Sequence, residues 1–309
     1  MIDRILLYTA SKYSRGLSIV ELLVAMTISL IAASTAIIIF FNFKDFYNHS
    51  AQKASIDIKE LTVKQAIYDS IINSGLSCAY GTNTQTYIND TGDDLSAHSF
   101  LTDSSNIRIG NISPNISDYL QTNLGTSCSG TCYQNNTDYI MVKTETKSTY
   151  LAANLVNSTL YLDSTNSINP GDYLALCNSD QIDLVKVSHV GNSNDITLFQ
   201  PATGQYIVDD YAGKFEILLF YIGDSGRVDN SGNTIYSLFL YIKSGSSVGQ
   251  NYELVSSVEN LKVSYATIKN DQIIWNNISS DTDVDTLNTP ALKFSFSVDG
   301  KNFTKVVLI

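Results

Sequence analysis

A single apolar segment near the N-terminus most strongly limits the structures that this chain can adopt. Residues 22–41 are a run of twenty residues without a charge, and Glu21 stands directly before them. At about 1.5 Å per residue, a helix of this length spans about 30 Å, which is the thickness of the hydrocarbon core of a bilayer. The sequence therefore predicts a single membrane-spanning helix over about 22–41.

The charges on either side of this segment predict its orientation. Lys12 and Arg15 precede it, whereas Lys44 and Asp45 follow it with no net positive charge. Lysine and arginine concentrate on the cytoplasmic side of membrane helices. We therefore expect a cytoplasmic N-terminus and export of everything that follows the helix.

The cleavage signal lies on an unusual side of the apolar run. An ordinary secretory signal carries its small-residue cleavage site after its apolar region. Here the candidate site, between Gly16 and Leu17, precedes the run, so cleavage would leave the helix on the mature protein. Glu21 would then be the fifth mature residue. This arrangement closely resembles the class III signal of type IV prepilins and pseudopilins.

The resemblance implies roles for three residues. In that family a prepilin peptidase cuts after the glycine, here Gly16, and methylates the new N-terminus, here Leu17. A carboxylate in the apolar zone costs up to about 3 kcal/mol. The resemblance implies that Glu21 pairs with the N-terminal amine of a neighbouring subunit during assembly. The alternative is a plain signal anchor in which Glu21 snorkels to the lipid headgroups.

The helix is expected to continue beyond the membrane. Apolar residues recur at three- and four-residue steps, with Gln65 the one polar interruption, and charged residues occupy other positions. This pattern predicts an amphipathic half that packs one face on the head. A coiled coil would also explain it, but clean heptads are few. The helix is predicted to end at Asn73-Ser74-Gly75. The predicted packing face comprises Phe43, Tyr47, Ala51, Ala54, Ile58, Leu61, Tyr68 and Ile72.

After Gly75 the pattern changes to short β-like runs separated by turn residues. Residues 224–226 with 230–233 predict one hairpin loop, and Asp299-Gly300 a second, tighter one. We expect an α+β fold, with a long N-terminal helix packed on a mostly antiparallel β-sheet head. The expected divisions are a leader at 1–16, the helix at 17–75 and the head at 76–309, whose first part, 76–138, is mainly loop. The predicted strands are 139–143, 159–162, 172–176, 182–190, 214–223, 235–242, 261–268, 273–275, 292–298 and 303–309.

Segments of the head narrow the resemblance to the larger, PilW-type minor pilins. Residues 171–177 with 183–187 resemble a strand pair of that family, as do 220–223 with 236–240. Residues 253–265 resemble its most recognisable head motif. Two positions depart from the pattern: Leu17 stands where phenylalanine is usual, and Leu240-Tyr241 replaces tyrosine-arginine.

The net charge narrows the class of partner. The chain carries 19 basic and 30 acidic residues, a net charge of −11, and no cluster of lysine and arginine. Such a surface does not favour nonspecific binding of nucleic acid or anionic lipid headgroups. We therefore do not expect a nucleic acid as partner.

The four cysteines all lie beyond the membrane span and predict disulfides in an oxidising compartment. Three pairings are possible. The short, glycine-containing loop between Cys128 and Cys132 favours a local bridge, which would leave Cys78 for Cys177. The latter bridge would close a long loop and contribute up to about 4–5 kcal/mol in the loop-entropy model. A zinc site is the rival, but no histidine lies near these cysteines in the sequence.

Two further patterns concern metal binding and catalysis. Asp281, Asp283 and Asp285 resemble the start of a calcium loop, but the glycine and glutamate of an EF-hand are absent, which favours a solvated acidic loop. Residues 245–249 fit the G-x-S-x-G pattern of a nucleophile elbow, yet the last histidine, His189, precedes them. We expect no cofactor and no enzymatic activity, and we keep calcium only as a weak candidate.

The resemblance implies a structural role as a minor pilin at or near the tip of a type IV pilus, where it helps to prime assembly. Its implied partners are other minor pilins, the major pilin, the prepilin peptidase, the inner-membrane platform protein and an adhesin at the tip. The implied location is the inner membrane, with a periplasmic head, and then the extracellular pilus. The alternatives are a minor pseudopilin of type II secretion and a tip-borne module for adhesion or DNA uptake.

Overall fold

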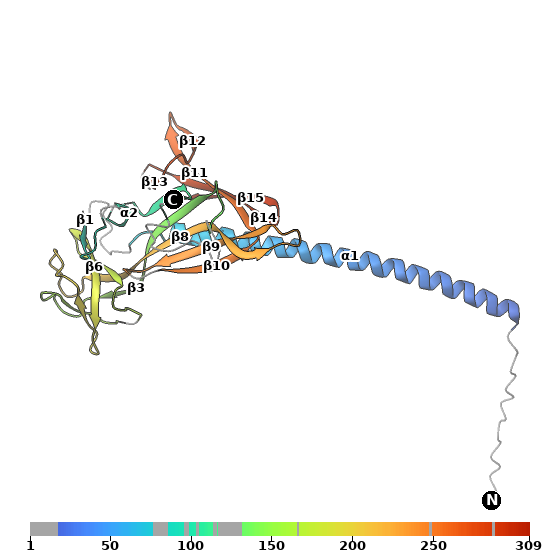
Figure 1. Ribbon diagram of the computed structural model, residues 1–309, viewed down its shortest axis with the longest axis horizontal. Coiled ribbons are helices and arrows are strands. Elements are labelled where there is room, and N and C mark those ends of the chain that lie inside the picture. Colours follow the sequence, from blue (N-terminus) through green and yellow to red (C-terminus); the bar gives the residue numbers. More distant parts are fainter. Residues whose placement is uncertain are drawn as a thin grey trace, which may run out of the picture. The chain divides into compact units, whose positions relative to one another are not determined.

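The computed structural model describes residues 18–76, 86–95, 99–102, 105–113, 116, 132–165, 167–246, 249–285 and 288–309. The chain forms two compact units, one up to Ser55 and one from Ile56 onward. The first contains most of a long helix, and the second contains the end of that helix together with a β-rich head (Figure 1).

Helix α1 (Ile19–Ile72) is 54 residues long. Its sequence contains neither proline nor glycine, so nothing in the chain interrupts the backbone hydrogen bonds of the helix. The helix ends where the sequence predicts. Gly75 adopts a φ of +108°, which glycine tolerates best, and its N–H donates to the Lys143 carbonyl at 2.8 Å. The chain thereby turns from the helix into the head.

The larger sheet of the head has eleven strands. Strands β9 (Thr234–Lys243) and β10 (Gln250–Ser256) branch from β8 as an antiparallel ladder, and β1 (Thr86–Asp90) pairs with β6 in parallel. A short helix, α2 (Ser99–Thr102), lies between β1 and β2 in the sequence. The main path runs in the order β13 (Thr282–Val284), β2 (Ile107–Asn111), β3 (Asp138–Tyr150), β8 (Tyr211–Val228), β5 (Tyr173–Cys177), β6 (Gln181–Val190), β7 (Asp195–Leu198) and β4 (Thr159–Tyr161).

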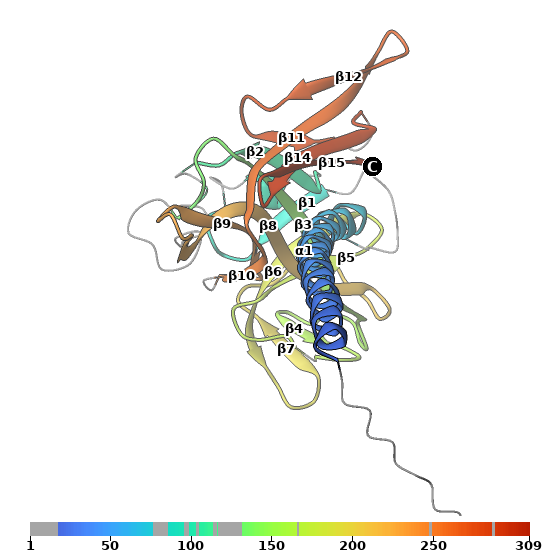
Figure 2. The ribbon, with the colours of Figure 1, turned by 90° about the vertical axis from the view of Figure 1, so that its right-hand side faces the viewer.

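The smaller sheet has four strands, all antiparallel. Figure 2 shows it stacked beside the larger sheet, with the hairpin of β11 and β12 at its outer end. The predicted turn at Asp299-Gly300 joins β14 to β15, and both residues have positive φ. The order is β12 (Gln272–Asn277), β11 (Val258–Lys269), β14 (Ala291–Val298) and β15 (Lys301–Leu308).

The predicted fold class is confirmed, and each predicted strand coincides with an observed one. One detail of the first hairpin is wrong. Residues 224–226 lie inside β8 at a register shift opposite β9, and the loop consists of residues 229–233 alone. Asp224 accepts a hydrogen bond from the Gly226 N–H, which stabilises this local kink and lets the strand continue.

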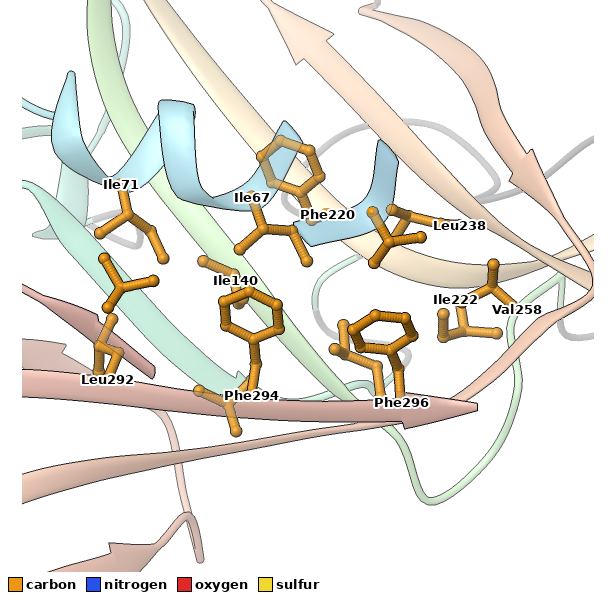
Figure 3. Packing of buried hydrophobic residues seen from close by; sticks show 14 of the residues in the cluster. Ile67, Ile71, Ile140, Phe220, Ile222, Leu238, Val258, Leu292, Phe294 and Phe296 are labelled. Atoms are coloured by element: carbon orange, nitrogen blue, oxygen red, sulfur yellow. The ribbon is translucent and has the colours of Figure 1, made fainter. Parts of the chain in front are cut away.

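The face of α1 that packs on the head is not the predicted one. The buried residues of the helix are Ile56, Val63, Ile67 and Ile71, whereas the predicted residue Ile58 is 66% exposed. Figure 3 shows Ile67 and Ile71 directed toward side chains from both sheets. These partners in the core are Ile140, Phe220, Ile222 and Leu238 of the larger sheet, and Leu292, Phe294 and Phe296 of the smaller one.

Lysine side chains explain why the buried face is hard to recognise in the sequence. Lys59 lies beside this face and reaches Asp299 at 2.9 Å. Lys64 forms an ion pair with Glu60 and places its ammonium 5.7 Å from the centre of the Phe303 ring. Long side chains of this kind cover apolar surface with their methylene groups while their charges stay at the edge of the core. The charged residues therefore mark the border of the packed face.

Candidate functional site

The start of α1 is fixed by a reciprocal pair of side-chain hydrogen bonds. The Ser18 hydroxyl oxygen accepts from the Val20 N–H at 3.3 Å, and Oε2 of Glu21 accepts from the Ser18 N–H at 3.0 Å. This is a variant of the capping box in which the hydroxyl meets the second rather than the third helical amide, and it satisfies backbone donors that the first turn of a helix leaves free. Glu21 therefore lies at the third position of the helix, and its carboxylate folds back toward Ser18, the residue that precedes the helix.

The first unit presents an uninterrupted apolar surface. Its large aliphatic and aromatic side chains from Ile19 to Tyr47 are each exposed over half or more of their area. α1 is the one helix in the described part of the chain that is long and apolar enough to cross a membrane. The few hydroxyl groups inside the apolar run are satisfied within the helix, since Thr27, Ser29 and Ser34 donate to carbonyls three or four residues earlier. Such a surface requires lipid or other apolar helices as its surroundings.

A second exposed apolar stripe lies on the part of α1 that belongs to the head unit. It consists of Ile58, Leu61, Tyr68 and Ile72, which remain exposed while the opposite stripe packs in the core. With Gln65 included, these residues follow steps of three and four, which is the heptad spacing of a seam between helices. The ammonium of Lys305 lies 5.2 Å from the centre of the Tyr68 ring at one border of the stripe. The head unit therefore exposes a helical surface suited to a further helix.

The N-terminal segment matches a known motif. The family model of the prokaryotic N-terminal methylation motif matches residues 11–37. This match supports a type IV pilin-like or pseudopilin-like protein. Comparison of the chain with curated proteins and with solved structures gives no match.

The motif and the apolar helix together fit a membrane-anchored protein like the pilins. Gly16 and Leu17, the predicted cleavage position, lie within the matched segment but outside the described residues. Glu21 is described, and its contact with Ser18 was not anticipated, although the spacing Ser-x-x-Glu is the signature of a capping box. A pilin-type motif suggests a structural rather than a catalytic protein.

The cysteines are described in part. Cys132 and Cys177 are both disulfide-bonded, whereas Cys78 and Cys128 lie outside the described residues. The pairing of Cys128 with Cys132 and of Cys78 with Cys177 therefore stays a prediction. Cys177 closes β5 in a small apolar cluster with Ala175, Ile182 and Tyr211.

The three aspartates considered for calcium have protein partners. Asp283 receives a two-pronged contact from the Arg108 guanidinium, at 2.5 and 2.7 Å. Burial by itself would lower the pKa of Arg108, but the hydrogen bonds and charge of Asp283 outweigh it and raise this pKa. Burial raises the pKa of the Tyr139 hydroxyl, and the neighbouring Asp281 carboxylate raises it further.

Asp285 belongs to a local turn rather than to this pair. Its carboxylate accepts from the Asn288 side chain at 2.5 Å, and its carbonyl accepts from the Thr289 N–H. Among the described residues, no group of three or more histidine, cysteine or acidic side chains is arranged to hold a metal ion. Calcium binding by this segment stays a prediction.

The structure also contains a buried acidic pair that sequence reasoning missed. Asp90 at the end of β1 and Asp183 in β6 are both buried. The consecutive amides of Thr203 and Gly204 donate to them, to Asp90 at 2.5 Å and to Asp183 at 2.7 Å. Burial raises the pKa of Asp183, and the nearby charge of Asp90 raises it further. The two residues lie far apart in the sequence, and the parallel pairing of β1 with β6 brings them together. No local sequence pattern therefore predicts the pair.

Proposed function

We propose that this chain is a minor pilin, a structural subunit placed at or near the tip of a type IV pilus, where it helps to prime assembly. The observation that carries the proposal is the methylation motif at residues 11–37, which includes the start of an exposed apolar helix. Processing would occur between Gly16 and Leu17, and the methylated Leu17 would begin the mature chain.

The proposed assembly mechanism uses α1 in two environments. Before assembly, lipid surrounds the apolar part of the helix; in the filament, the helices of neighbouring subunits replace the lipid. A carboxylate at Glu21 needs a cation as its partner there, because an unpaired charge in a low-dielectric environment is strongly destabilising. The N-terminal amine of a neighbour is the proposed cation, and the pair would set the register between subunits.

The form of the head favours a place for this subunit at the end of the filament over a repeated place along it. A subunit repeated along a filament must fit its head between those of its neighbours. This head combines two sheets with a hairpin of β11 and β12 that extends beyond them (Figures 1 and 2). The exposed stripe at Ile58, Leu61, Tyr68 and Ile72 is the surface that we assign to a helix of an adjoining subunit. The proposed partners are other minor pilins, the major pilin, the platform protein and a tip adhesin, with the prepilin peptidase acting first.

A minor pseudopilin of type II secretion is the second candidate, because the same motif and anchor serve it equally well. The two candidates differ in the machine that takes up the subunit. Deleting the chain would remove surface pili in the first case and secretion of exported enzymes in the second.

The first test is the intact mass and N-terminal sequence of the protein made with and without a prepilin peptidase. We expect a peptidase-dependent start at Leu17 carrying one added methyl group. The variant Gly16→Ala should stay uncut, because the peptidase recognises the glycine, whereas Ser14→Ala, two residues earlier, should be processed normally. An uncut wild-type chain, or a cut beyond the apolar run, would contradict the proposal.

A further inference from the structure

Strand β12 is an open edge of the smaller sheet. It pairs along its whole length with β11, from Lys269–Gln272 to Ser264–Asn277, without a bulge. No strand in the described part of the chain pairs with its other side. Figures 1 and 2 both show the hairpin of β11 and β12 extending beyond the other strands of the head. A further strand could therefore approach this edge.

The edge lacks the features by which proteins usually protect such strands. Natural edges carry charges, proline or a bulge, which prevent pairing with another chain. Residues 272–280 contain neither a charge nor a proline, although the chain as a whole has a net charge of −11. Each face of β12 exposes an apolar side chain beside uncharged polar ones, since Ile273 is 63% exposed on one face and Ile274 is 41% exposed on the other. Trp275, the only tryptophan of the chain, is 36% exposed on the same face as Ile273.

The turn of the hairpin fixes which backbone groups face outward. Asn270 and Asp271 have φ values of 52° and 58°, and they connect the paired residues Lys269 and Gln272, so this is a two-residue turn with left-handed residues. The pair that flanks such a turn exchanges hydrogen bonds, and hydrogen-bonded pairs then alternate along the ladder. The N–H and C=O groups of Ile273 and Trp275 therefore point away from β11, toward the open edge.

We propose that this edge pairs with β12 of a second copy of the chain, antiparallel and with the two-fold axis at Ile274. In this register Ile273 of each copy lies opposite Trp275 of the other. The outward backbone groups of these residues meet as two hydrogen-bonded pairs, one on each side of the axis. Ile274 faces Ile274 of the other copy on the opposite face, in a non-hydrogen-bonded pair where side chains approach closely. No like charges oppose each other, because β12 has none. A two-fold interface requires this kind of self-complementarity.

The proposed contact is small and is expected to depend on anchoring. Specific stable complexes bury about 1,200–2,000 Å², more than one pair of short strands supplies. Two chains held in one membrane meet at a raised effective concentration, which favours weak contacts of this kind. This inference does not rest on the proposed function. It requires the open edge of β12 and anchoring of the chain in a membrane, but it does not require assembly into a filament.

Disulfide trapping of the full-length protein in membranes tests the register. The variant Ile274→Cys should give a disulfide-linked homodimer on mild oxidation. The control is Ile268→Cys, which replaces the same residue type on the neighbouring strand, where Ile268 is 63% exposed and so more accessible than Ile274 at 41%. Residue 268 would lie at least three strand spacings from its counterpart, more than about 14 Å, which is too far for a disulfide. Equal trapping at both positions, no dimer at Ile274, or trapping of a different protein would overturn the proposal.

Fluorescence of Trp275 gives a second, independent measurement. As the ratio of protein to lipid rises, we expect its emission to shift to shorter wavelength and its quenching by acrylamide to fall. Ile274→Lys should abolish both changes, because two lysines would then face each other at the two-fold axis. Ile268→Lys adds the same charge one strand away and should leave both changes in place. A loss with both variants, or with neither, would contradict pairing through β12.

Discussion

At the residue scale, Glu21 combines a contact within its own helix with a charge that the helix does not neutralise. Its carboxylate accepts from the Ser18 N–H at 3.0 Å, which stabilises the first turn of α1. The same carboxylate stands at the entrance of a long apolar helix, where the proposed assembly mechanism gives it an intermolecular partner. The capping role needs an oxygen acceptor, whereas the pairing role needs a negative charge, so substitutions can separate them.

We predict that Glu21→Gln is processed and forms α1 normally but fails to enter filaments. The amide oxygen of glutamine can still accept from Ser18, while the charge is gone. Ser18→Ala is the matched control, because it removes the hydroxyl half of the cap, about 1 kcal/mol, and leaves the charge in place. The measurement is the amount of each variant in sheared filaments relative to the membrane fraction. Normal incorporation of Glu21→Gln would show that the charge is dispensable.

At the scale of elements, the sequence predicts the type of each long segment better than its partners. The strands rich in β-branched and aromatic residues are all present, and α1 ends at Ile72, directly before the predicted stop at Asn73-Ser74-Gly75. The sequence does not predict the short strands β1, β2, β7, β10 and β13, because three to seven residues carry little periodic signal. The sequence predicts the wrong packing face for α1, because the helix has two apolar stripes and lysines border the one that packs.

The two stripes of α1 predict opposite effects for the same substitution. Ile67→Ala removes a side chain that is fully buried between the two sheets, and should destabilise the head by about 2–5 kcal/mol. Ile58→Ala, on the exposed stripe, should change stability by less than about 0.5 kcal/mol, yet should lower incorporation into filaments. Thermal unfolding of the detergent-solubilised protein provides the first value, and the filament fraction the second. Equal destabilisation by both variants would contradict the observed packing.

At the scale of the whole molecule, contacts between distant segments define the head, and these lay beyond sequence reasoning. Asp138 in β3 accepts from the Val263 N–H of β11 at 2.7 Å and from the Asn111 side chain, which ties the larger sheet to the smaller. The order of strands in the larger sheet places β8 between β3 and β5. Such an order depends on which faces bury one another, and a pattern within any one segment does not contain that information.

One of these long-range contacts predicts how stability depends on pH. Asp183 has a raised pKa in the folded head, because burial disfavours its charged form and the neighbouring Asp90 raises the pKa further. A carboxyl group whose pKa is higher in the folded than in the unfolded state binds its proton more tightly when folded. Its contribution to stability is therefore fully present below the ordinary aspartate pKa and is lost as the pH rises through the raised value. Each unit of difference corresponds to about 1.4 kcal/mol.

We predict that Asp183→Asn makes the head more stable at neutral pH and flattens the decline of stability above pH about 4. An asparagine can still accept from the Gly204 N–H, and the repulsion between two carboxylates is removed. Its amide nitrogen then replaces the oxygen that accepts from the Gln181 side chain at 2.6 Å, so the Gln181 amide must turn over to keep that contact. Asp180→Asn is the matched control, because Asp180 is exposed just before β6 and its replacement should leave the pH profile unchanged. The measurement is the midpoint of thermal unfolding from pH 4 to pH 8 for the three proteins. Burial also raises the pKa of Glu216, so a shallower decline of the same sign should remain in Asp183→Asn. A profile for Asp183→Asn as steep as that of the wild type would show that Asp90 and Asp183 do not compete for a proton in the folded head.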